Sequence, residues 1–139
     1  MSTEHPARAA SQQSMELVTK KPPNAKERWL ALFADDAIIE DPIGPSPLDP
    51  EGKGHRGKAA LAAFWDMNIG PNELRFDIER SYACGNEVAN VGTITTKTPM
   101  GITVSVPGVF TYRINDAGQL VALRAYWEFD TVMGALGAV

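Results

Sequence analysis

The chain has 139 residues, of which 44% are hydrophobic and 22% charged, and this length and composition are typical of one soluble globular domain. Its formal net charge is −4 at pH 7. Nucleic-acid binders usually carry a basic patch, so this acidic chain is not expected to bind nucleic acid. Residues 1–10 are polar with scattered alanines, and we expect a flexible tail there, followed by a single domain over 11–139.

The sequence shows no sign of export or of membrane insertion. No apolar run approaches the ~20 residues of a membrane-spanning helix, and the polar N-terminus lacks the apolar core of a signal peptide. Cys84 is the only cysteine, so no internal disulfide can form, and no neighbouring His or Lys would make its thiol reactive. We expect a semi-buried structural thiol and a cytoplasmic protein without a membrane partner.

Two helices are predicted in the N-terminal third of the chain. The first covers residues 11–20, with an earlier start left open, and it ends before Pro22, because proline cannot continue a helix. The second begins after Asn24, a favourable N-cap residue, and closes at Asp35 and Asp36. The apolar residues of the second helix are spaced mostly at i, i+3 and i+4, and they are Trp29, Leu30, Leu32 and Phe33.

A short β segment at 37–40 is followed by a long loop over 43–57 that is rich in proline and glycine. Loops of this length are usually functional or disordered, and the sequence leaves open whether this one closes over a pocket as a lid. A third helix is predicted over 58–68, with Phe64 and Trp65 facing inward.

From residue 72 onward the apolar period changes to the alternation that is typical of strands. Three turns divide this region into four predicted strands at 72–84, 88–98, 102–114 and 119–129. Helices that come first and strands that come later indicate an α+β fold. About three N-terminal helices would pack on one face of a curved, mostly antiparallel β-sheet.

The segment 52–57 matches the pattern G-x-G-x-x-G and precedes a predicted helix. A dinucleotide-binding motif must follow a strand inside a parallel βαβ unit, whereas a proline-rich loop precedes this one. We therefore expect a flexible loop and no cofactor, with a weak anion site at the helix N-terminus as the alternative. The two histidines, His5 and His55, belong to no set of residues with metal-ligand spacing, so no metal is expected.

Asp41 is the residue that the pattern singles out for chemistry. Glu40 and Asp41 are adjacent, so they point to opposite faces of an extended strand, and Asp41 shares a face with Ile39. Pro42 restricts Asp41 to extended geometry. Asp41 is therefore either an inward-facing carboxylate at the mouth of a pocket or a simple cap of the turn before Pro42. In the last predicted strand, Tyr126 and Trp127 point to opposite faces, so one of them should face inward.

The stretch 29–44, WLALFADDAIIEDPIG, resembles the ketosteroid isomerase (SnoaL-like) branch of the nuclear-transport-factor-2-like superfamily. Members carry a very similar Ala-Asp-Asp-Ala-x-x-Glu-Asp-Pro-x-Gly, and residues 57–65 and 110–127 extend the resemblance over about 12–130. It implies a cone-shaped fold that encloses an apolar pocket. It also implies an Asp base that moves a proton between carbons of a steroid enone, while a Tyr and a protonated Asp donate hydrogen bonds to the oxygen.

By this resemblance Asp41 occupies the position of the catalytic base, and Trp127 that of an indole near the base. The residues expected to contact the substrate are Leu17, Phe33, Trp65, Phe110, Tyr126 and Trp127. Leu17 stands where the family has its oxyanion Tyr, and Phe110 where it has its oxyanion Asp. Loss of one such donor typically costs about 3–4 kcal/mol of transition-state stabilisation. The residues that could replace these donors are Trp65, Trp127, Tyr112, Tyr126 and Asn90.

Such apolar surroundings should raise the pKa of Asp41, so that it could act as a general acid as readily as a base. The resemblance implies a cofactor-free isomerase of the steroid Δ5-isomerase type, acting on a steroid-like or polycyclic carbonyl compound. Two alternatives stay open: a lyase, dehydratase or cyclase on the same scaffold, and a non-catalytic binder of apolar small molecules.

Family members commonly dimerise through the open face of the sheet, so a homodimer is expected.

Overall fold

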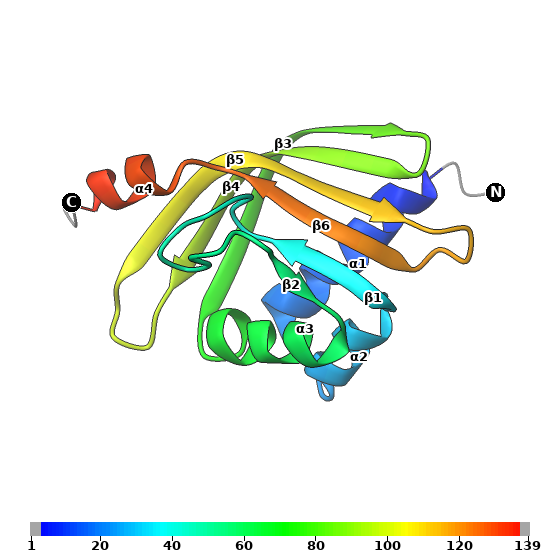
Figure 1. The fold of residues 1–139 in the computed structure, drawn as a ribbon, viewed down its shortest axis with the longest axis horizontal. Coiled ribbons are helices and arrows are strands. Elements are labelled where there is room, and N and C mark those ends of the chain that lie inside the picture. The colour runs from blue at the N-terminus through cyan, green and yellow to red at the C-terminus, as the bar shows by residue number, and fades with distance from the viewer. Residues whose placement is uncertain (1–3, 137–139) are drawn as a thin grey trace.

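The structure is a computed structural model that describes residues 4–136, and it consists of one curved β-sheet with helices on its concave side (Figure 1). The helical elements are α1 (Pro6–Lys20), α2 (Ala25–Ala31), α3 (Lys58–Phe64), the π-helical turn η1 (Trp65–Ile69) and α4 (Phe129–Ala135). The strands are β1 (Phe33–Glu40), β2 (His55–Arg56), β3 (Glu73–Cys84), β4 (Glu87–Lys97), β5 (Thr103–Ile114) and β6 (Leu120–Tyr126).

The sheet has the strand order β2-β1-β6-β5-β4-β3. Strands β1 and β6 are parallel, and all other neighbours in the sheet are antiparallel. Figure 1 shows α1, α2 and α3 beneath the arch of the sheet, whereas α4 lies apart from them near one end of β5. The predicted α+β fold, with three helices packed on one face of a curved and mostly antiparallel sheet, is confirmed.

The first helix begins earlier than the sequence pattern indicated. It starts at Pro6, and the ring of His5 caps it by accepting a hydrogen bond from the backbone N–H of Ala7 at 3.1 Å. Proline suits the first helical position, because the N–H that it lacks would have no partner there. Ala7 and Ala10 are buried. Residues 6–10 are therefore part of a packed helix and not of the predicted flexible tail.

The second helix is shorter than predicted. It ends at Ala31, and the residues expected to close it, Asp35 and Asp36, lie in β1 with exposed side chains. The backbone N–H of Leu120 donates to the carbonyl of Leu32 at 2.8 Å, which joins the start of β1 to β6. Pairing with a neighbouring strand thus overrides the helical spacing of the apolar residues in this segment.

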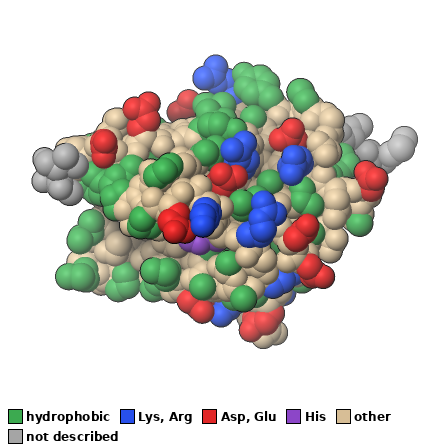
Figure 2. Space-filling view, viewed as in Figure 1, with side chains coloured by type: hydrophobic (Ala, Val, Ile, Leu, Met, Phe, Trp, Pro, Cys, Tyr) green, Lys and Arg blue, Asp and Glu red, His purple; other side chains and the backbone are tan. Residues whose placement is uncertain are grey.

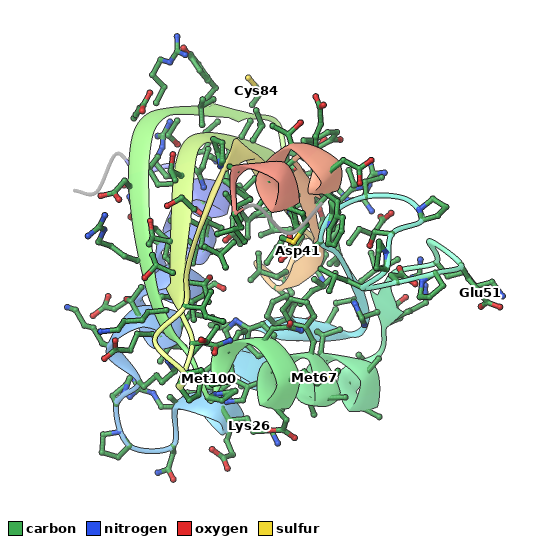
Figure 3. The ribbon with its side chains drawn as sticks, turned by 90° about the vertical axis from the view of Figure 1, so that its left-hand side faces the viewer. Lys26, Asp41, Glu51, Met67, Cys84 and Met100 are labelled. Atoms are coloured by element: carbon green, nitrogen blue, oxygen red, sulfur yellow. The ribbon has the colours of Figure 1, made fainter. Side chains whose placement is uncertain are left out.

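Three smaller features also differ from the prediction. Strand β6 ends at Tyr126, and Phe129, which was predicted in this strand, begins α4. Residues 55–56, predicted as loop, form the edge strand β2. Cys84 is exposed rather than semi-buried, because the alternation of β3 turns Ala83 toward the core and Cys84 away from it, as Figure 3 shows.

Trp29 joins the helices to the sheet at the centre of the core. Its side chain is 1% exposed, and its ring centroid lies 4.8 Å from that of Phe33 and 5.3 Å from that of Trp65. The indole N–H donates a hydrogen bond to Ser14 Oγ at 3.0 Å, so the one polar atom of the side chain has a partner. This cluster fixes α1, α2 and η1 relative to one another.

Replacement of Trp29 with alanine should lower the free energy of unfolding by about 3–5 kcal/mol, because it leaves a cavity where the three helical segments meet. Met100→Ala is the matched control. The Met100 side chain is 87% exposed, so its loss should change the free energy by less than about 0.5 kcal/mol. Urea unfolding followed by circular dichroism measures both values, and equal values for the two variants would contradict the central position of Trp29.

Candidate active site

A cavity of about 360 Å³ lies between the inner face of the sheet and the segment formed by α3 and η1. Sites for small molecules in proteins typically measure about 300–1,000 Å³. The wall is largely apolar and includes Val18, Phe64, Leu74, Phe76, Ile94 and Phe110. The exposed side chains of Leu48 and Met67 also border the cavity. Since Leu48 belongs to the long loop over 43–57, this loop forms part of one side of the cavity. Figure 2 shows hydrophobic side chains gathered around a hollow on the left of the visible face.

Asp41 follows directly after β1, and its side chain borders the cavity. Ile39, two residues earlier, is fully buried and pairs with Leu123 of β6, which also lines the cavity. Side chains two residues apart share a face of a strand, so the inward position of Asp41 follows from the register. In Figure 3, Asp41 lies at the edge of the hollow that separates the sheet from the segment that carries Met67.

Trp127 holds the Asp41 carboxylate in place. The indole Nε1–H donates a hydrogen bond to Asp41 Oδ1 at 2.7 Å, a length typical of bonds to a charged acceptor. Within residues 4–136 the structure gives the other oxygen, Oδ2, no hydrogen-bond partner. One carboxylate oxygen is therefore anchored, and the other is free to react. In the chain that follows Asp41, the Asp41–Pro42 peptide bond is cis, and the Ile43 N–H donates to the carbonyl of Ala125 at 3.1 Å.

Burial raises the pKa of Asp41 above its ordinary value of 3.8, because removal from water disfavours the charged carboxylate. The hydrogen bond from Trp127 and the positive charge of protonated His55 lower the pKa and so act in the opposite direction. The net direction agrees with the prediction from the apolar surroundings. Asp41 is partly exposed because it borders the cavity, although the protein surrounds it closely enough for desolvation to dominate.

His55 enters the same cavity from the edge strand β2. It pairs with Ile39 of β1, and its ring centroid lies 5.1 Å from that of Phe64. Gly54 allows this close approach of β2 to β1, because it has φ +76° and a Cβ atom there would lie 2.9 Å from Glu40 Cγ. Sequence reasoning considered His55 only as a metal ligand, and no periodicity marks a strand of two residues.

Tyr112 is a second polar residue of the cavity that was not among the predicted contact residues. It lies on β5 two residues after Phe110, so both side chains face inward, and each is 3% exposed. Burial raises the pKa of Tyr112 above its ordinary value of 10.0, and the negative charge of Asp41 raises it further. The alternation within the predicted strand 102–114 was sufficient to place Tyr112 beside Phe110.

The SnoaL-like domain model matches residues 12–123, which is most of the chain. The chain belongs to the SnoaL-like domain family. The match covers β1 to β5, the first half of β6 and the residue at the centre of the candidate site, Asp41.

Solved structures of related SnoaL-like proteins share both the fold and a substantial part of the sequence. The Δ5-3-ketosteroid isomerase from Mycobacterium sp. is 47% identical, with a TM-score of 0.84 over 91% of this chain and 96% of that chain. RV0760c from Mycobacterium tuberculosis, solved in complex with estradiol-17β-hemisuccinate, is 41% identical, with a TM-score of 0.83 over 91% and 97%. A computationally designed 17-OHP binder is 39% identical, with a TM-score of 0.85 over 91% and 96%. The predicted resemblance to ketosteroid isomerases is thereby confirmed.

The residues predicted to contact a substrate do not all meet in this SnoaL-like cavity. Phe110 and Trp127 line it together with Asp41. Leu17 borders a separate groove between α1 and α2, Phe33 is fully buried in the core, and Trp65 packs on Trp29. These three residues lie behind the cavity wall rather than on its surface.

Tyr126 is placed on the opposite face of the sheet from the cavity. It is 48% exposed, and its hydroxyl accepts a hydrogen bond from Arg124 Nη1 at 3.4 Å. Of the two adjacent aromatic residues, Trp127 is the one that faces inward, so the expected contact between Tyr126 and a ligand in the cavity is not supported by the geometry. Adjacent residues of a strand cannot share a face.

Within residues 4–136, no group of three or more His, Cys, Asp or Glu side chains is arranged to hold a metal ion. None of the helices in this part of the chain is long and apolar enough to cross a membrane. The polar side chains that border the cavity near Asp41 are the imidazole of His55, the phenol of Tyr112 and the indole of Trp127.

The raised pKa of Asp41 predicts how stability depends on pH. Above about pH 3.8 the unfolded chain loses this proton, while the folded protein retains it until the pH exceeds the raised pKa. The stabilising effect of the bound proton is therefore complete below pH 3.8 and disappears as the pH rises through the folded pKa.

Asp41→Asn removes this titration and should raise the free energy of unfolding at pH 8, because the neutral amide carries no charge that burial disfavours. The gain should shrink as the pH falls toward 4. Asp36→Asn changes an exposed carboxylate of β1 and is the control, with no comparable gain expected. Urea unfolding between pH 4 and pH 8 tests this, and a variant that is less stable than the wild type at pH 8 would contradict it.

Proposed function

We propose that this protein is a cofactor-free isomerase of the steroid Δ5-isomerase type, in which Asp41 carries a proton between two carbons of a hydrophobic carbonyl substrate. The observation that supports this most strongly is the environment of Asp41. One oxygen is anchored by Trp127, the other is free, and both face an apolar cavity. A desolvated carboxylate with a raised pKa is a stronger base than one in water, and it is also able to return the proton.

The proposed substrate class rests on the cavity and on the relatives. The cavity wall is largely aliphatic and aromatic, which favours a flat, apolar molecule with few polar atoms. One relative was solved with estradiol-17β-hemisuccinate and another was designed to bind 17-OHP. We propose that this chain likewise takes a steroid-like or polycyclic carbonyl compound.

The reaction can be written with the residues of the cavity alone. Asp41 Oδ2 removes a proton from the carbon between the carbonyl and the isolated double bond. The electron pair of the broken C–H bond moves into the conjugated system, and negative charge develops on the carbonyl oxygen. Asp41, now protonated, gives the proton to the far carbon, so that the double bond shifts into conjugation and the carboxylate is regenerated. Trp127 keeps its hydrogen bond to Oδ1 throughout and so limits rotation of the carboxylate.

A second candidate function is favoured by His55. Its imidazole faces the same cavity as Asp41 and, when protonated, can give a proton to a leaving hydroxyl group. Asp41 would remove the proton α to a carbonyl, the β carbon–oxygen bond would break, and water would leave with the proton from His55. The isomerase reaction does not use this second acid. The presence of His55 in the cavity is therefore the observation that favours a dehydratase or related lyase as the second candidate.

The predicted homodimer stays a prediction. The outer face of the sheet carries an apolar row across three strands, in which Val91, Val109 and Tyr126 are adjacent by register. Such a row on an open sheet is typical of a face that packs against a partner. The cytoplasmic location and the absence of a nucleic-acid partner also stay predictions from composition, as does the single domain.

Wild-type protein should convert 5-androstene-3,17-dione to the conjugated enone, as measured by the rise in ultraviolet absorbance. Asp41→Asn should lower kcat by at least about 10²–10⁴-fold, because the amide cannot accept the proton. The exposed carboxylate variant Asp36→Asn is the control and should retain wild-type kcat. The acidic limb of kcat/KM for the wild type should lie above pH 3.8, since the base must be ionised. Absence of turnover in the wild type would remove the isomerase proposal.

The two candidate functions are separated by His55→Gln. An isomerase should keep kcat within a few-fold, because no step of the proton shuttle uses the imidazole. A dehydratase acting on a β-hydroxy ketone should lose about 10²-fold or more of its rate of water elimination, because the acid that assists the leaving group is gone. Mass-spectrometric detection of the dehydrated product decides between the two functions. If neither wild-type reaction occurs but steroids bind, the protein is a binder.

A further inference from the structure

The proposed reaction places negative charge on a carbonyl oxygen, and a site built for it needs a hydrogen-bond donor directed at that oxygen. The two positions at which the sequence resemblance places such donors are occupied by Leu17 and Phe110. Leu17 does not line the cavity, and Phe110 lines it with a phenyl ring. The donor must therefore come from another part of the cavity wall.

Four of the five donors considered from the sequence are unavailable to a molecule in the cavity. The indole of Trp127 already donates to Asp41, and the side-chain amide of Asn90 donates to Ser11 Oγ at 3.4 Å in the buried core. Tyr126 faces the opposite side of the sheet, and Trp65 lies behind the cavity wall. Tyr112 is the remaining candidate of this set.

The Tyr112 hydroxyl has the position that such a donor requires. Within residues 4–136 this hydroxyl has no hydrogen-bond partner. Every fully buried side-chain nitrogen or oxygen of this region has one, so the hydroxyl is not fully buried. Because Tyr112 lines the cavity, the hydroxyl must reach the cavity surface. Tyr112 pairs with Leu123 of β6, and Leu123 pairs with Ile39, two residues before Asp41. Phenol and carboxylate thus project from the same face of three adjacent strands.

We propose that Tyr112 is a catalytic residue whose hydroxyl donates a hydrogen bond to the substrate's carbonyl oxygen while Asp41 removes the neighbouring proton. This assignment rests on the proposed function. As the C–H bond breaks and its electron pair moves toward the oxygen, the O–H···O contact becomes a bond to an anion and strengthens. The proton stays on Tyr112 throughout, so the phenol ends the reaction unchanged.

The electrostatics of the cavity favour this assignment over one in which Tyr112 acts as a base. Burial and the charge of Asp41 both raise the pKa of Tyr112, so the hydroxyl remains a donor across the neutral pH range. Because the side chain is only 3% exposed, a hydrogen bond from it to an enolate lies in a largely apolar environment, where such bonds are stronger than in water. A phenol that stays protonated at neutral pH and has no partner within residues 4–136 is suited to donating at this position.

The other polar side chains of the cavity are less suitable. Ser14 Oγ accepts the indole N–H of Trp29, and Asn68 and Asn72 donate to backbone carbonyls at 3.3 and 2.9 Å. Thr96 pairs with Leu74 and Val104. It lies six residues further along β4 than Asn90, the residue of β4 that pairs with Phe110 of the cavity wall.

The test compares Tyr112→Phe, which removes only the hydroxyl, with Tyr126→Phe, which removes one from the outer face. For the conversion of 5-androstene-3,17-dione, Tyr112→Phe should lower kcat by about 10²–10³-fold with little change in KM, because the hydrogen bond is strongest in the transition state. Tyr126→Phe should match the wild type. Wild-type kcat in Tyr112→Phe would overturn the assignment.

A binding measurement keeps this assignment separate from the proposed function. The product-type enone 4-androstene-3,17-dione absorbs at longer wavelength when its carbonyl accepts a strong hydrogen bond. The wild type and Tyr126→Phe should shift its absorbance maximum to the red, and Tyr112→Phe should bind it without that shift.

If the wild type turns over no ketone but shows a shift that Tyr112→Phe abolishes, the isomerase proposal fails and the role of Tyr112 as carbonyl donor stands. A red shift that persists in Tyr112→Phe would overturn the role of Tyr112, whatever the turnover.

Discussion

The parallel pairing of β1 with β6 is the constraint on which the site depends. Parallel strands end at the same edge of a sheet, so the residue after β1 and the residue after β6 are brought together. These residues are Asp41 and Trp127, and the 2.7 Å hydrogen bond between them joins the two strand ends. The same pairing places Leu123 between Ile39 and Tyr112, which carries the inner face across to β5. The positions of Asp41, Trp127 and Tyr112 therefore follow from these three adjacent strands and their ends.

The apolar cavity that suits a hydrophobic small molecule also determines the pKa of the Asp41 carboxylate. Desolvation raises the pKa of Asp41 and opposes folding at neutral pH, while the indole and the imidazole offset part of that effect. A more polar cavity would stabilise the carboxylate and weaken it as a base. The protein thus gives up some stability at one position for a base that can accept and return a proton, which is a common balance at active sites.

Local patterns in the sequence predicted most of the sheet, because β3, β4 and β5 follow regular alternation and end at recognisable turns. The same alternation placed Asp41 on the face of Ile39 and separated Tyr126 from Trp127. The errors occurred where long-range pairing decides the structure. Residues 33–36 were predicted in the second helix but belong to β1, where Phe33 pairs with Leu120 of β6. Residues 55–56 form a strand by pairing with β1. No property of the segment around His55 reveals that its ring enters the cavity.

The position of His55 has a consequence for how this scaffold can change over evolutionary time. Tyr112 lies in β5, and Asp41 and Trp127 directly follow β1 and β6, all three of which are interior strands of the sheet. His55 comes from a two-residue edge strand at the end of a surface loop, and its only strand neighbour is β1. Insertions, deletions and substitutions in this loop can exchange the side chain that faces Asp41 across the cavity while Asp41 itself stays fixed. One framework can in this way present different polar groups to a ligand through a segment at the edge of the sheet.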